Sequence, residues 1–513
     1  MLVKTRGASL FGMDAIGIQV EVNVSMGQGY CIVGLPDTAV KESLHRTEIA
    51  IKANGFQMPR TKLVINLAPA DIKKTGPAFD LPIAIGILAA SDQIINSTVL
   101  TDYLMMGELS LNGALQPIKG VLAMAIYAKE AGLSGLIIPS INAAEASLIE
   151  GLKVYAFDHL TEVTHFCNHP ESFTPFQQIE TDNETPINYP VDFAFIKGQF
   201  QAKRAIEIAA AGGHNLIMVG PPGAGKTLLA KTSISILPPM SHAETLETSK
   251  VYSLLGKLSQ KAGLMQTRPF RNPHHSLSAI ALVGGGSIPQ PGEISMAHNG
   301  VLFLDELPEF SRAAIEILRQ PMEAGFVSIS RSRQTVEFPS RFMLFASMNP
   351  CPCGYFNHPQ KACTCSPSIV GKYLHKISGP LLDRIDLQIE VVPVTYEELT
   401  NNSIIESSLT IRNRVQNARA IQLNRYAKRP GINTNAQMQS YDLKEWAQLD
   451  DASATLLKMA MEQFHLSARA YDRIIKVART IADLDGSKDI QNQHISESIQ
   501  YRILDRAGWG QAY

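Results

Sequence analysis

Apolar and polar residues alternate along the chain in patterns that change character near residues 168, 191 and 396. Before residue 168, short strand-like apolar runs alternate with longer helix-like runs. The predicted strands lie at residues 16–24, 62–67 and 136–138, and the predicted helices at residues 39–54, 78–90 and 120–130. Residues 1–167 are therefore expected to form one domain that contains both helices and strands.

The segment at residues 168–190 has the composition of a linker. Among polar and acidic residues it contains Pro170, Pro175, Pro186 and Pro190. Such a proline-rich polar stretch favours an extended connection. A second α/β region is expected over residues 191–395. From residue 396 onward apolar residues recur at helical spacing, so residues 396–513 are expected to form an all-helical domain.

A glycine-rich segment follows an apolar run at residues 215–219 and precedes a predicted helix at residues 228–236. It matches G-x-x-x-x-G-K-[ST] at every specified position and consists of Gly220, Pro221, Pro222, Gly223, Ala224, Gly225, Lys226 and Thr227. The glycines let backbone N–H groups point at phosphate oxygens, and the helix N-terminus adds partial positive charge. Lys226 would bridge the β- and γ-phosphates of ATP, and the Thr227 hydroxyl would bind Mg²⁺. The alternative is a chance glycine-rich turn, which the flanking strand and helix disfavour.

Two further strand ends carry polar side chains suited to ATP hydrolysis. The apolar run at residues 301–304 ends in Asp305 and Glu306. Asp305 would hold Mg²⁺, and Glu306 would polarise the attacking water. A strand predicted at residues 341–348 leads to Asn349, whose amide could hold that water near the γ-phosphate. Taken singly, the acidic strand end could simply face solvent, and Asn-Pro could be only a turn.

Four of the six cysteines lie within fifteen residues, as Cys351, Cys353, Cys363 and Cys365. Paired thiolates are typical ligands of Zn²⁺, and four of them fill a closed structural site. The C-x-C spacing departs from the commoner x₂₋₄ spacing, so free thiols or a redox pair remain alternatives. The clustering suits a reducing compartment better than a disulfide framework.

The composition narrows the class of protein further. The chain has 513 residues, of which 45% are hydrophobic and 18% charged, as in ordinary globular proteins. No apolar run reaches the ~20 residues that span a bilayer, and the N-terminus lacks the apolar core of a signal peptide. We therefore expect a cytoplasmic protein with no membrane partner. Lys and Arg number 46 against 47 Asp and Glu, so any affinity for nucleic acid must come from local patches.

The order of the motifs carries a resemblance to a known family. The phosphate loop, the Leu-Asp-Glu strand end, Asn349 and Gly-Pro-Leu-Leu-Asp-Arg-Ile-Asp at residues 379–386 together resemble AAA+ ATPases of the magnesium-chelatase-like branch. Over essentially the whole chain the sequence resembles the YifB/ComM family. The resemblance implies a central AAA+ P-loop α/β domain, a C-terminal helical lid and assembly into a ring, expected to be a hexamer. It implies that Arg384 is an arginine finger in the site of a neighbouring subunit and that Arg469 is a lid arginine over the phosphates. A surface ion pair is the alternative for either arginine.

A β-hairpin is predicted at residues 325–338, with Arg331 and Arg333 at its tip. In related ring motors a hairpin before the Asn-bearing strand enters the pore and grips DNA. Two arginines on such a tip suit phosphate contacts, which position DNA without reading its sequence. A solvated turn is the alternative. A run of basic residues between positions 411 and 431 could also follow a nucleic-acid backbone, but a solvated face or a subunit contact is favoured.

Residues 73–84 and 107–113 resemble the proteolytic domain of Lon, which implies a Lon-protease-like α+β domain at the N-terminus. That domain uses a Ser–Lys dyad. Here the serine position holds Ala78 and the lysine position holds Leu122. We therefore expect no peptidase activity and a role in assembly or in contacts with DNA or partners.

The resemblance implies an ATP-hydrolysing hexameric ring motor that acts on single-stranded and branched DNA. Its expected function is that of a branch-migration helicase that helps to integrate incoming single-stranded DNA during natural transformation and homologous recombination. The alternative is a protein-remodelling chaperone or a magnesium-chelatase-type ATPase subunit, which would need a separate metal-inserting partner.

Overall fold

The fold was analysed in a computed structural model, which forms two compact units built from interleaved parts of the chain. The first unit contains Met1–Thr185, His242–Gln266 and Ser330–Phe338, and the second contains Pro186–Ser241, Thr267–Ile329 and Pro339–Tyr513. The predicted central and C-terminal regions thus share one unit, apart from two segments that belong to the first. The structure describes residues 1–96, 98–177, 189–258, 264–286, 288–331, 334–356, 358, 361–400, 406–429, 431–502 and 504.

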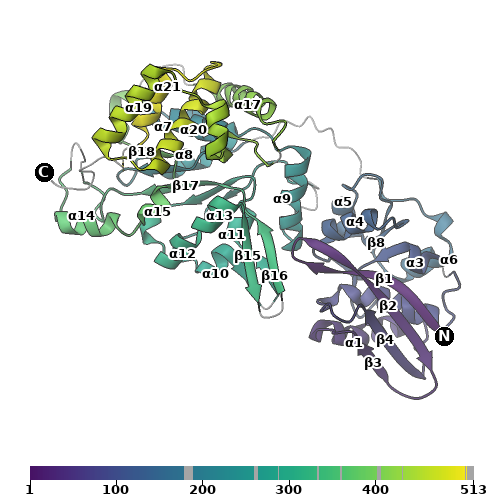
Figure 1. Cartoon of the computed structure of the whole chain (residues 1–513). Coiled ribbons are helices and arrows are strands. Elements are labelled where there is room, and N and C mark those ends of the chain that lie inside the picture. The colour runs from purple at the N-terminus through teal and green to yellow at the C-terminus, as the bar shows by residue number, and fades with distance from the viewer. Residues whose placement is uncertain are drawn as a thin grey trace. The chain divides into compact units, whose positions relative to one another are not determined.

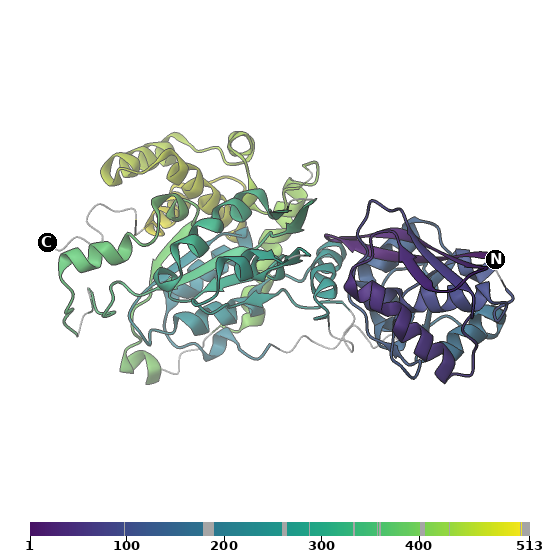
Figure 2. The ribbon, with the colours of Figure 1, turned by 90° about the horizontal axis from the view of Figure 1, so that it is seen from below.

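A seven-stranded sheet with strand order β3-β4-β2-β1-β5-β8-β9 forms the centre of the first unit. β1 and β2 pair antiparallel over their whole length, and they run side by side in purple in Figures 1 and 2. The sheet strands are β1 (Leu2–Phe11), β2 (Asp14–Ser25), β3 (Tyr30–Val33), β4 (Lys62–Ala68), β5 (Tyr103–Met105), β8 (Gly135–Pro139) and β9 (Val154–Phe157). The helices are α1 (Thr38–Ala53), α2 (Asp80–Ala90), α3 (Thr98–Asp102), α4 (Val121–Glu130), α5 (Ala143–Ala146), α6 (Leu160–Asn168) and α9 (His242–Leu254). A short pair, β6 (Glu108–Leu109) and β7 (Leu115–Gln116), lies outside the main sheet.

Both faces of this sheet are buried at β8, which explains the run of consecutive apolar residues in that strand. In β8, Ile137 packs into a cluster with α1, α2 and α6, whereas Leu136 and Ile138 pack into a second cluster with α4. Successive side chains of a strand point to opposite faces, so helices on both faces require apolar residues at every position. Helices therefore pack on both faces of the sheet at β8, within a unit that contains both helices and strands, as the sequence predicts.

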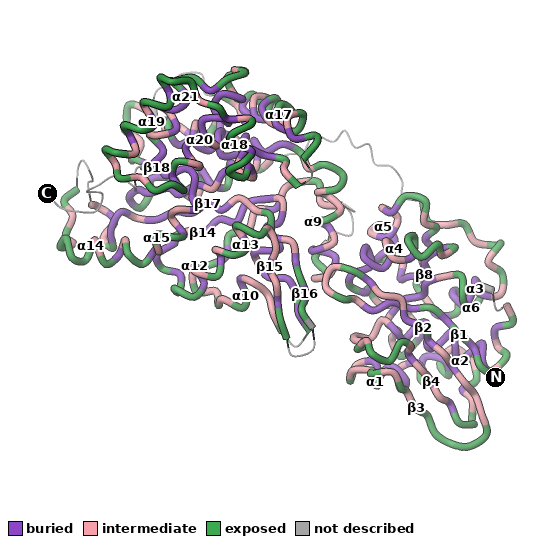
Figure 3. Tube along the Cα trace, in the orientation of Figure 1, coloured by how far each residue is buried: buried purple, intermediate pink, exposed green. Residues whose placement is uncertain are grey.

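The second unit is built on a parallel sheet with strand order β11-β14-β17-β10-β18. Its strands are β10 (Leu216–Val219), β11 (Phe270–Arg271), β14 (Val301–Leu304), β17 (Met343–Met348) and β18 (Leu387–Glu390). β14 and β17 are buried almost throughout, as the purple trace in Figure 3 shows. β10, the first of these strands in the chain, lies between β17 and β18, so the strand order reverses beside it. Ligands of open α/β sheets bind at the carboxyl ends of the strands at such a point.

Helices α7, α17 and α20 pack on one another next to this sheet (Figure 1). The helices of the second unit are α7 (Phe200–Gly212), α8 (Lys226–Thr232), α10 (Ala279–Val283), α11 (Glu293–Met296), α12 (Arg312–Ile317), α13 (Arg319–Ala324), α14 (Pro367–Leu374), α15 (Gly379–Leu382), α16 (Tyr396–Thr400), α17 (Ser408–Arg425), α18 (Ser440–Trp446), α19 (Asp451–Phe464), α20 (Ala468–Leu484) and α21 (Asn492–Gln500). Two further strand pairs are β12 (Gly284–Gly285) with β13 (Gln290–Pro291), and β15 (Phe326–Arg331) with β16 (Gln334–Pro339). The C-terminal region is helical, as the spacing of its apolar residues predicts.

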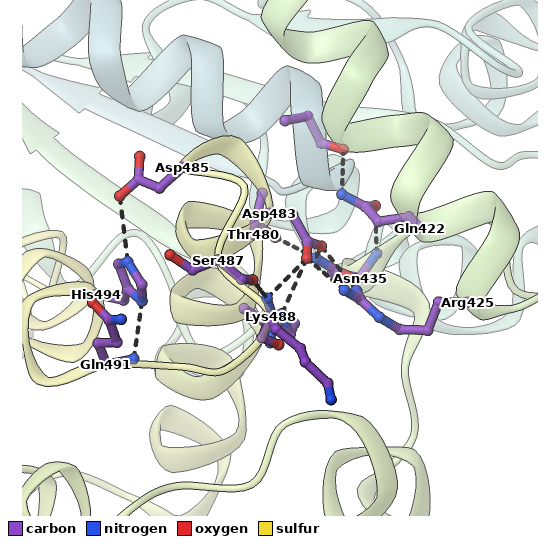
Figure 4. A network of polar contacts seen from close by, with 12 residues as sticks. Gln422, Arg425, Asn435, Thr480, Asp483, Asp485, Ser487, Lys488, Gln491 and His494 are labelled. Carbon is purple, nitrogen blue, oxygen red and sulfur yellow. Dashed lines mark hydrogen bonds and ion pairs between the residues drawn. The ribbon is translucent and has the colours of Figure 1, made fainter.

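A buried polar network holds the C-terminal helices together (Figure 4). The Asp483 carboxylate accepts hydrogen bonds from Arg425 of α17 at 2.5 Å and 2.8 Å, and from Arg479 one turn earlier on α20 at 3.1 Å. Asn435 Nδ2 donates to the same carboxylate at 2.8 Å. Removing Asp483 would leave two buried guanidinium groups without their counter-charge, which costs about 3–5 kcal/mol in comparable buried pairs. The network therefore fixes how α20 packs against α17.

No helix among the described residues is long and apolar enough to cross a membrane.

Candidate active site

The phosphate loop joins β10 to α8, as its sequence predicts. Gly223 and Gly225 have φ angles of 80° and 87°, which side chains rarely tolerate, so glycine is required at these positions. The ammonium group of Lys226 donates to the carbonyl oxygens of Gly220 at 2.6 Å and Pro221 at 2.9 Å. These bonds hold the lysine inside the loop, where a phosphate group would lie.

Burial lowers the pKa of Lys226 to about 8, although the nearby Asp305 and Glu306 carboxylates act in the opposite direction. The ammonium group of Lys226 is thus partly desolvated before any ligand binds. An incoming phosphate would add negative charge next to the buried ammonium, beyond that of the two carboxylates. It would therefore raise the pKa of Lys226 again. Lys226 is therefore poised to attract an anion at neutral pH.

Asp305 follows β14 and lies directly beside the phosphate loop. Its Oδ2 atom accepts a hydrogen bond from the Thr227 hydroxyl at 2.7 Å, and its Oδ1 atom accepts one from the Ser347 hydroxyl. Carboxylate and hydroxyl oxygens are the ligands that Mg²⁺ prefers. The pairing of Asp305 with Thr227 thus fits the predicted Mg²⁺ site, since it brings a carboxylate oxygen and a hydroxyl oxygen together.

Glu306 follows Asp305 in a left-handed backbone conformation. Its φ of 54° lies in the left-handed region, which costs a non-glycine residue about 1–2 kcal/mol. Its N–H donates to the Ser347 hydroxyl at 3.2 Å, and this bond helps to hold the strained turn. The Glu306 carboxylate is 53% exposed and lies 3.7 Å from Nδ1 of His275. The role of Glu306 in polarising the attacking water stays a prediction.

Asn349 follows β17, and its Oδ1 atom accepts a hydrogen bond from Lys226 Nζ at 3.1 Å. The strand order explains this contact, because β17 pairs directly with β10. Lys226 and Asn349 are therefore joined by one hydrogen bond, and Thr227 and Asp305 by another, at the same edge of the sheet. The sequence predicts this grouping.

The two predicted arginines lie in ion pairs of their own. The Arg384 side chain is only 10% exposed and pairs with Glu323, while its Nη1 donates to the carbonyl of Pro380 at 2.5 Å. Arg469 is 62% exposed, and its Nη1 lies 3.6 Å from Oδ2 of Asp383. Within this chain, Arg384 therefore pairs with Glu323, and Arg469 pairs with Asp383, the residue before Arg384. Their roles as finger and lid arginines stay predictions.

The four cysteines form a compact sulfur cluster. Their Sγ atoms all lie within 4.8 Å of one another. The Sγ atom of Cys351 lies 3.3 Å from that of Cys353 and 3.7 Å from that of Cys363. A tetrahedral zinc site with Zn–S bonds of about 2.3 Å would place its sulfur atoms about 3.8 Å apart. The geometry of the thiols therefore fits a single Zn²⁺ ion.

The predicted DNA-binding hairpin is formed by β15 and β16, and Arg331 at the end of β15 is exposed. Arg333 lies outside the described residues. The Ser330 and Thr335 hydroxyls join the two strands near the tip, at 3.1 Å. The hairpin itself is confirmed, and its contact with DNA stays a prediction.

The basic run on α17 is largely engaged in contacts within the chain. Arg412 Nε donates to the carbonyl of Ser235 at 2.7 Å. Arg414 pairs with Glu207 at 2.6 Å and with Glu406 at 2.7 Å. These guanidinium groups hold α17 against its neighbours, which agrees better with a contact surface than with a nucleic-acid surface.

The two positions of the Lon-type dyad lie within apolar packing of the first unit. Leu122 is buried in a hydrophobic cluster, and Ala78 packs against the same cluster. Helix α9 covers this region, because the Ser253 hydroxyl accepts from the Leu122 N–H at 3.4 Å and bonds to the half-buried Glu145. The absence of peptidase activity stays a prediction, and these contacts give it a structural basis.

Sequence reasoning did not identify Ser347 or His275 as site residues. Ser347 is fully buried and bonds to both Asp305 and Glu306, yet its position within an apolar strand gives no motif. His275 precedes the acidic strand end by about thirty residues, so only the fold brings it to Glu306. The sequence signal that could have pointed to Ser347 is a polar residue within an otherwise apolar strand. A polar side chain buried in this way needs a hydrogen-bond partner.

Fold and site together define a P-loop nucleotide-binding protein whose candidate catalytic groups lie at the carboxyl edge of a parallel sheet. Three regions match family models of a magnesium chelatase subunit. Residues 192–399 match "Magnesium chelatase, subunit ChlI", residues 20–142 match "Subunit ChlI of Mg-chelatase", and residues 405–502 match "Magnesium chelatase, subunit ChlI C-terminal".

Curated relatives match over nearly the whole chain. The chain is 42% identical over 508 residues to the uncharacterized protein YifB of Escherichia coli K12, covering 98% of this chain and 97% of YifB. It is 43% identical over 501 residues to the competence protein ComM of Haemophilus influenzae, covering 96% of each. A partial similarity to Lon protease 2 of Bacillus subtilis is 27% identical over 200 residues and covers 35% of each chain. The chain belongs to the YifB/ComM family of magnesium-chelatase-like AAA+ ATPases, and this membership implies ATP and Mg²⁺ at the site.

Proposed function

We propose that this chain is one subunit of an ATP-driven hexameric ring motor that acts on single-stranded and branched DNA. The observation that carries the proposal is the 43% identity, over 96% of each chain, to a protein named for competence. In this proposal the motor is a branch-migration helicase that aids the integration of incoming single strands by homologous recombination.

The ATP site supports the motor part of this proposal. Lys226 and the phosphate loop would hold the phosphates, and Asp305 with Thr227 would hold Mg²⁺, which neutralises charge on the phosphates when bound. Glu306 would accept a proton from the attacking water, and Asn349 would position that water.

The two arginines would complete the site from outside the phosphate loop. Arg384 bonds to Glu323 in its own chain, so its action as a finger requires a neighbouring subunit and the exchange of this ion pair. Arg469 is exposed on α20 and would reach the phosphates as part of the lid.

The hairpin formed by β15 and β16 supports the proposed action on DNA. Arg331 is exposed at the end of β15, where a guanidinium can reach a phosphate of the DNA backbone. Arg333, by its sequence position, would lie beside it at the tip. Because the whole chain carries a net charge of −1, DNA affinity would have to come from such a local group.

The test is the ATPase rate of the full chain with and without single-stranded DNA and a four-stranded junction. We expect both DNA forms to raise the rate in wild type, and the double variant Arg331→Ala, Arg333→Ala to lose this response while it keeps its basal rate. Arg319→Ala is the matched control, because Arg319 is an arginine of α13 that pairs with Glu316 at 2.6 Å. An ATPase rate that DNA does not change in the wild type contradicts the proposal.

The chelatase descriptions of the matching family models favour a second candidate, a motor subunit that remodels a protein partner. This function predicts that the ATPase rate responds to protein and not to DNA. Unwinding of the junction by the wild-type chain would exclude it as the main activity.

The cysteine cluster is the proposed site of one structural Zn²⁺ ion, held by Cys351, Cys353, Cys363 and Cys365. Metal analysis of protein purified without chelator should give one zinc per chain. The Cys353→Ser, Cys363→Ser variant should give none, and Cys31→Ser should give one, because Cys31 lies outside the cluster. A wild-type chain without zinc contradicts this assignment.

A further inference from the structure

The segment that carries the cysteines leaves the sheet directly beside the phosphate loop. This cysteine segment comprises residues 350–366, between β17 and α14. Just before it, the Met348 carbonyl accepts a hydrogen bond from the Gly220 N–H at 3.1 Å. The next residue, Asn349, bonds to Lys226. The start of the cysteine segment is therefore tied to the loop that would hold the phosphates.

A second contact follows five residues further along. Gly354 has a φ of 84°, and a Cβ atom added to it would lie 2.5 Å from Cδ and 2.8 Å from Cγ of Pro222. A turn with a 2.9 Å bond from the Gly354 N–H to the Cys351 carbonyl places it there. The backbone of the cysteine segment thus rests on the ring of Pro222, at a separation that only glycine allows.

None of the described residues of the cysteine segment belongs to a helix or a strand. Hydrogen bonds to cysteine sulfur atoms help to hold its described residues in place. The Phe356 N–H donates to Sγ of Cys351 at 3.3 Å, and the Cys365 N–H donates to Sγ of Cys363 at 3.4 Å. A Zn²⁺ ion would join both ends of the segment, since its ligands include Cys351 at one end and Cys365 at the other. Without the ion, these weak bonds to sulfur are the main restraints that the cluster supplies.

We propose that the metal-bound cysteine segment is a support for the phosphate loop, and that it sets the affinity of the site for nucleoside triphosphates through the contact of Gly354 with Pro222. The inference rests on the zinc assignment made above. Pro222 immediately precedes Gly223, whose φ of 80° is part of the phosphate-binding conformation. A fixed Pro222 keeps the loop in this conformation before the ligand arrives, and such preorganisation strengthens binding. The contact of Gly354 is with Pro222 of the loop and not with Asn349, the residue proposed to position the attacking water, so it affects nucleotide affinity more than the maximal rate.

The test compares two glycine variants. Gly354→Ala places a methyl group against Pro222, and we expect the Kd for a fluorescent ATP analogue to rise about tenfold or more, because overpacking of this size displaces the neighbour. Zinc content should stay at one per chain, and kcat at saturating ATP should change less than KM. Gly431→Ala is the matched control, because Gly431 has a similar φ of 91° and an added Cβ atom would have no neighbour within 4 Å. Its Kd should equal that of the wild type.

Zinc removal supplies the second arm of the test. The Cys353→Ser, Cys363→Ser variant should lose zinc, and its Kd for the ATP analogue should rise, as in Gly354→Ala. Its thermal unfolding should still show a cooperative transition. Gly354→Ala with a Kd equal to that of Gly431→Ala overturns the support role. A zinc-free variant with wild-type affinity overturns it as well. A wild-type chain that contains no zinc, but whose Gly354→Ala variant binds ATP weakly, overturns the metal assignment and leaves the contact with Pro222 in place.

Discussion

The buried ammonium of Lys226 gives nucleotide binding a pH dependence that the structure allows us to calculate. Its pKa is about 8 before a ligand binds, because the group is desolvated. The bound phosphate raises this pKa, so the complex keeps the proton at a pH where the free protein has lost it. Affinity is therefore nearly full at pH 7 and falls as the pH rises through about 8.

The size of the effect follows from the protonated fraction of the free lysine. One unit above its pKa, about one chain in eleven retains the proton, so the Kd for nucleotide should rise about tenfold between pH 7 and pH 9. Binding at pH 9 should also take up nearly one proton per site. Titration calorimetry in two buffers of different ionisation enthalpy measures both quantities.

Lys226→Arg is the control for this prediction, because a guanidinium stays charged throughout the range. The variant should bind more weakly, since its geometry differs, but its Kd should not change between pH 7 and pH 9. A wild-type Kd that is constant over this range would refute the reasoning. An equal slope in the arginine variant would assign the pH dependence to another group.

Three further predictions concern the groups around the phosphates. Ser347→Ala removes one donor from the Asp305 carboxylate, so kcat should fall about 10- to 100-fold and half-maximal activity should need more Mg²⁺; an unchanged Mg²⁺ dependence would exclude this positioning role. Arg384→Ala should lower kcat by about 10³–10⁵ with nucleotide binding intact, and mixing it with Glu306→Gln chains should restore activity if the arginine acts on a neighbour; the absence of rescue would argue against action between subunits. His275→Phe should change kcat by no more than about fivefold, because a partly exposed polar contact of 3.7 Å contributes little, and a larger loss in a steady-state assay would place His275 in the chemistry.

Much of the site could be predicted from the sequence because its residues sit in short local patterns. The phosphate loop needs glycine wherever its backbone takes a positive φ angle. Gly223 and Gly225 have such angles. Asp305 and Asn349 each follow a run of apolar residues that is typical of a buried strand. The helix predicted at residues 228–236 is shorter, as α8 ends at Thr232 and a 3₁₀ turn follows. The position of this boundary depends on tertiary packing, which local propensity does not include.

Other features depend on which elements the fold places side by side. The segment at residues 242–254 lies between the phosphate loop and the acidic strand in sequence, yet as α9 it packs in the first unit, against α4. Nothing in the local sequence pattern of this segment indicates that it packs in the first unit. The arginines of α17 look alike in the sequence, and only the structure shows that Arg412 and Arg414 are held by contacts within the chain.

The phosphate loop, the two strand-end motifs and the four-cysteine pattern can be recognised in the sequence, since each consists of residues a few positions apart. The folded chain is needed to see that Ser347 joins Asp305 to Glu306, that the four sulfur atoms gather in one cluster, and that Gly354 rests on Pro222. These contacts join residues from separate strands and loops. The contacts of Ser347 and of Gly354 with other segments depend on the strand order β14-β17-β10, which long-range packing sets and short-range pattern does not encode.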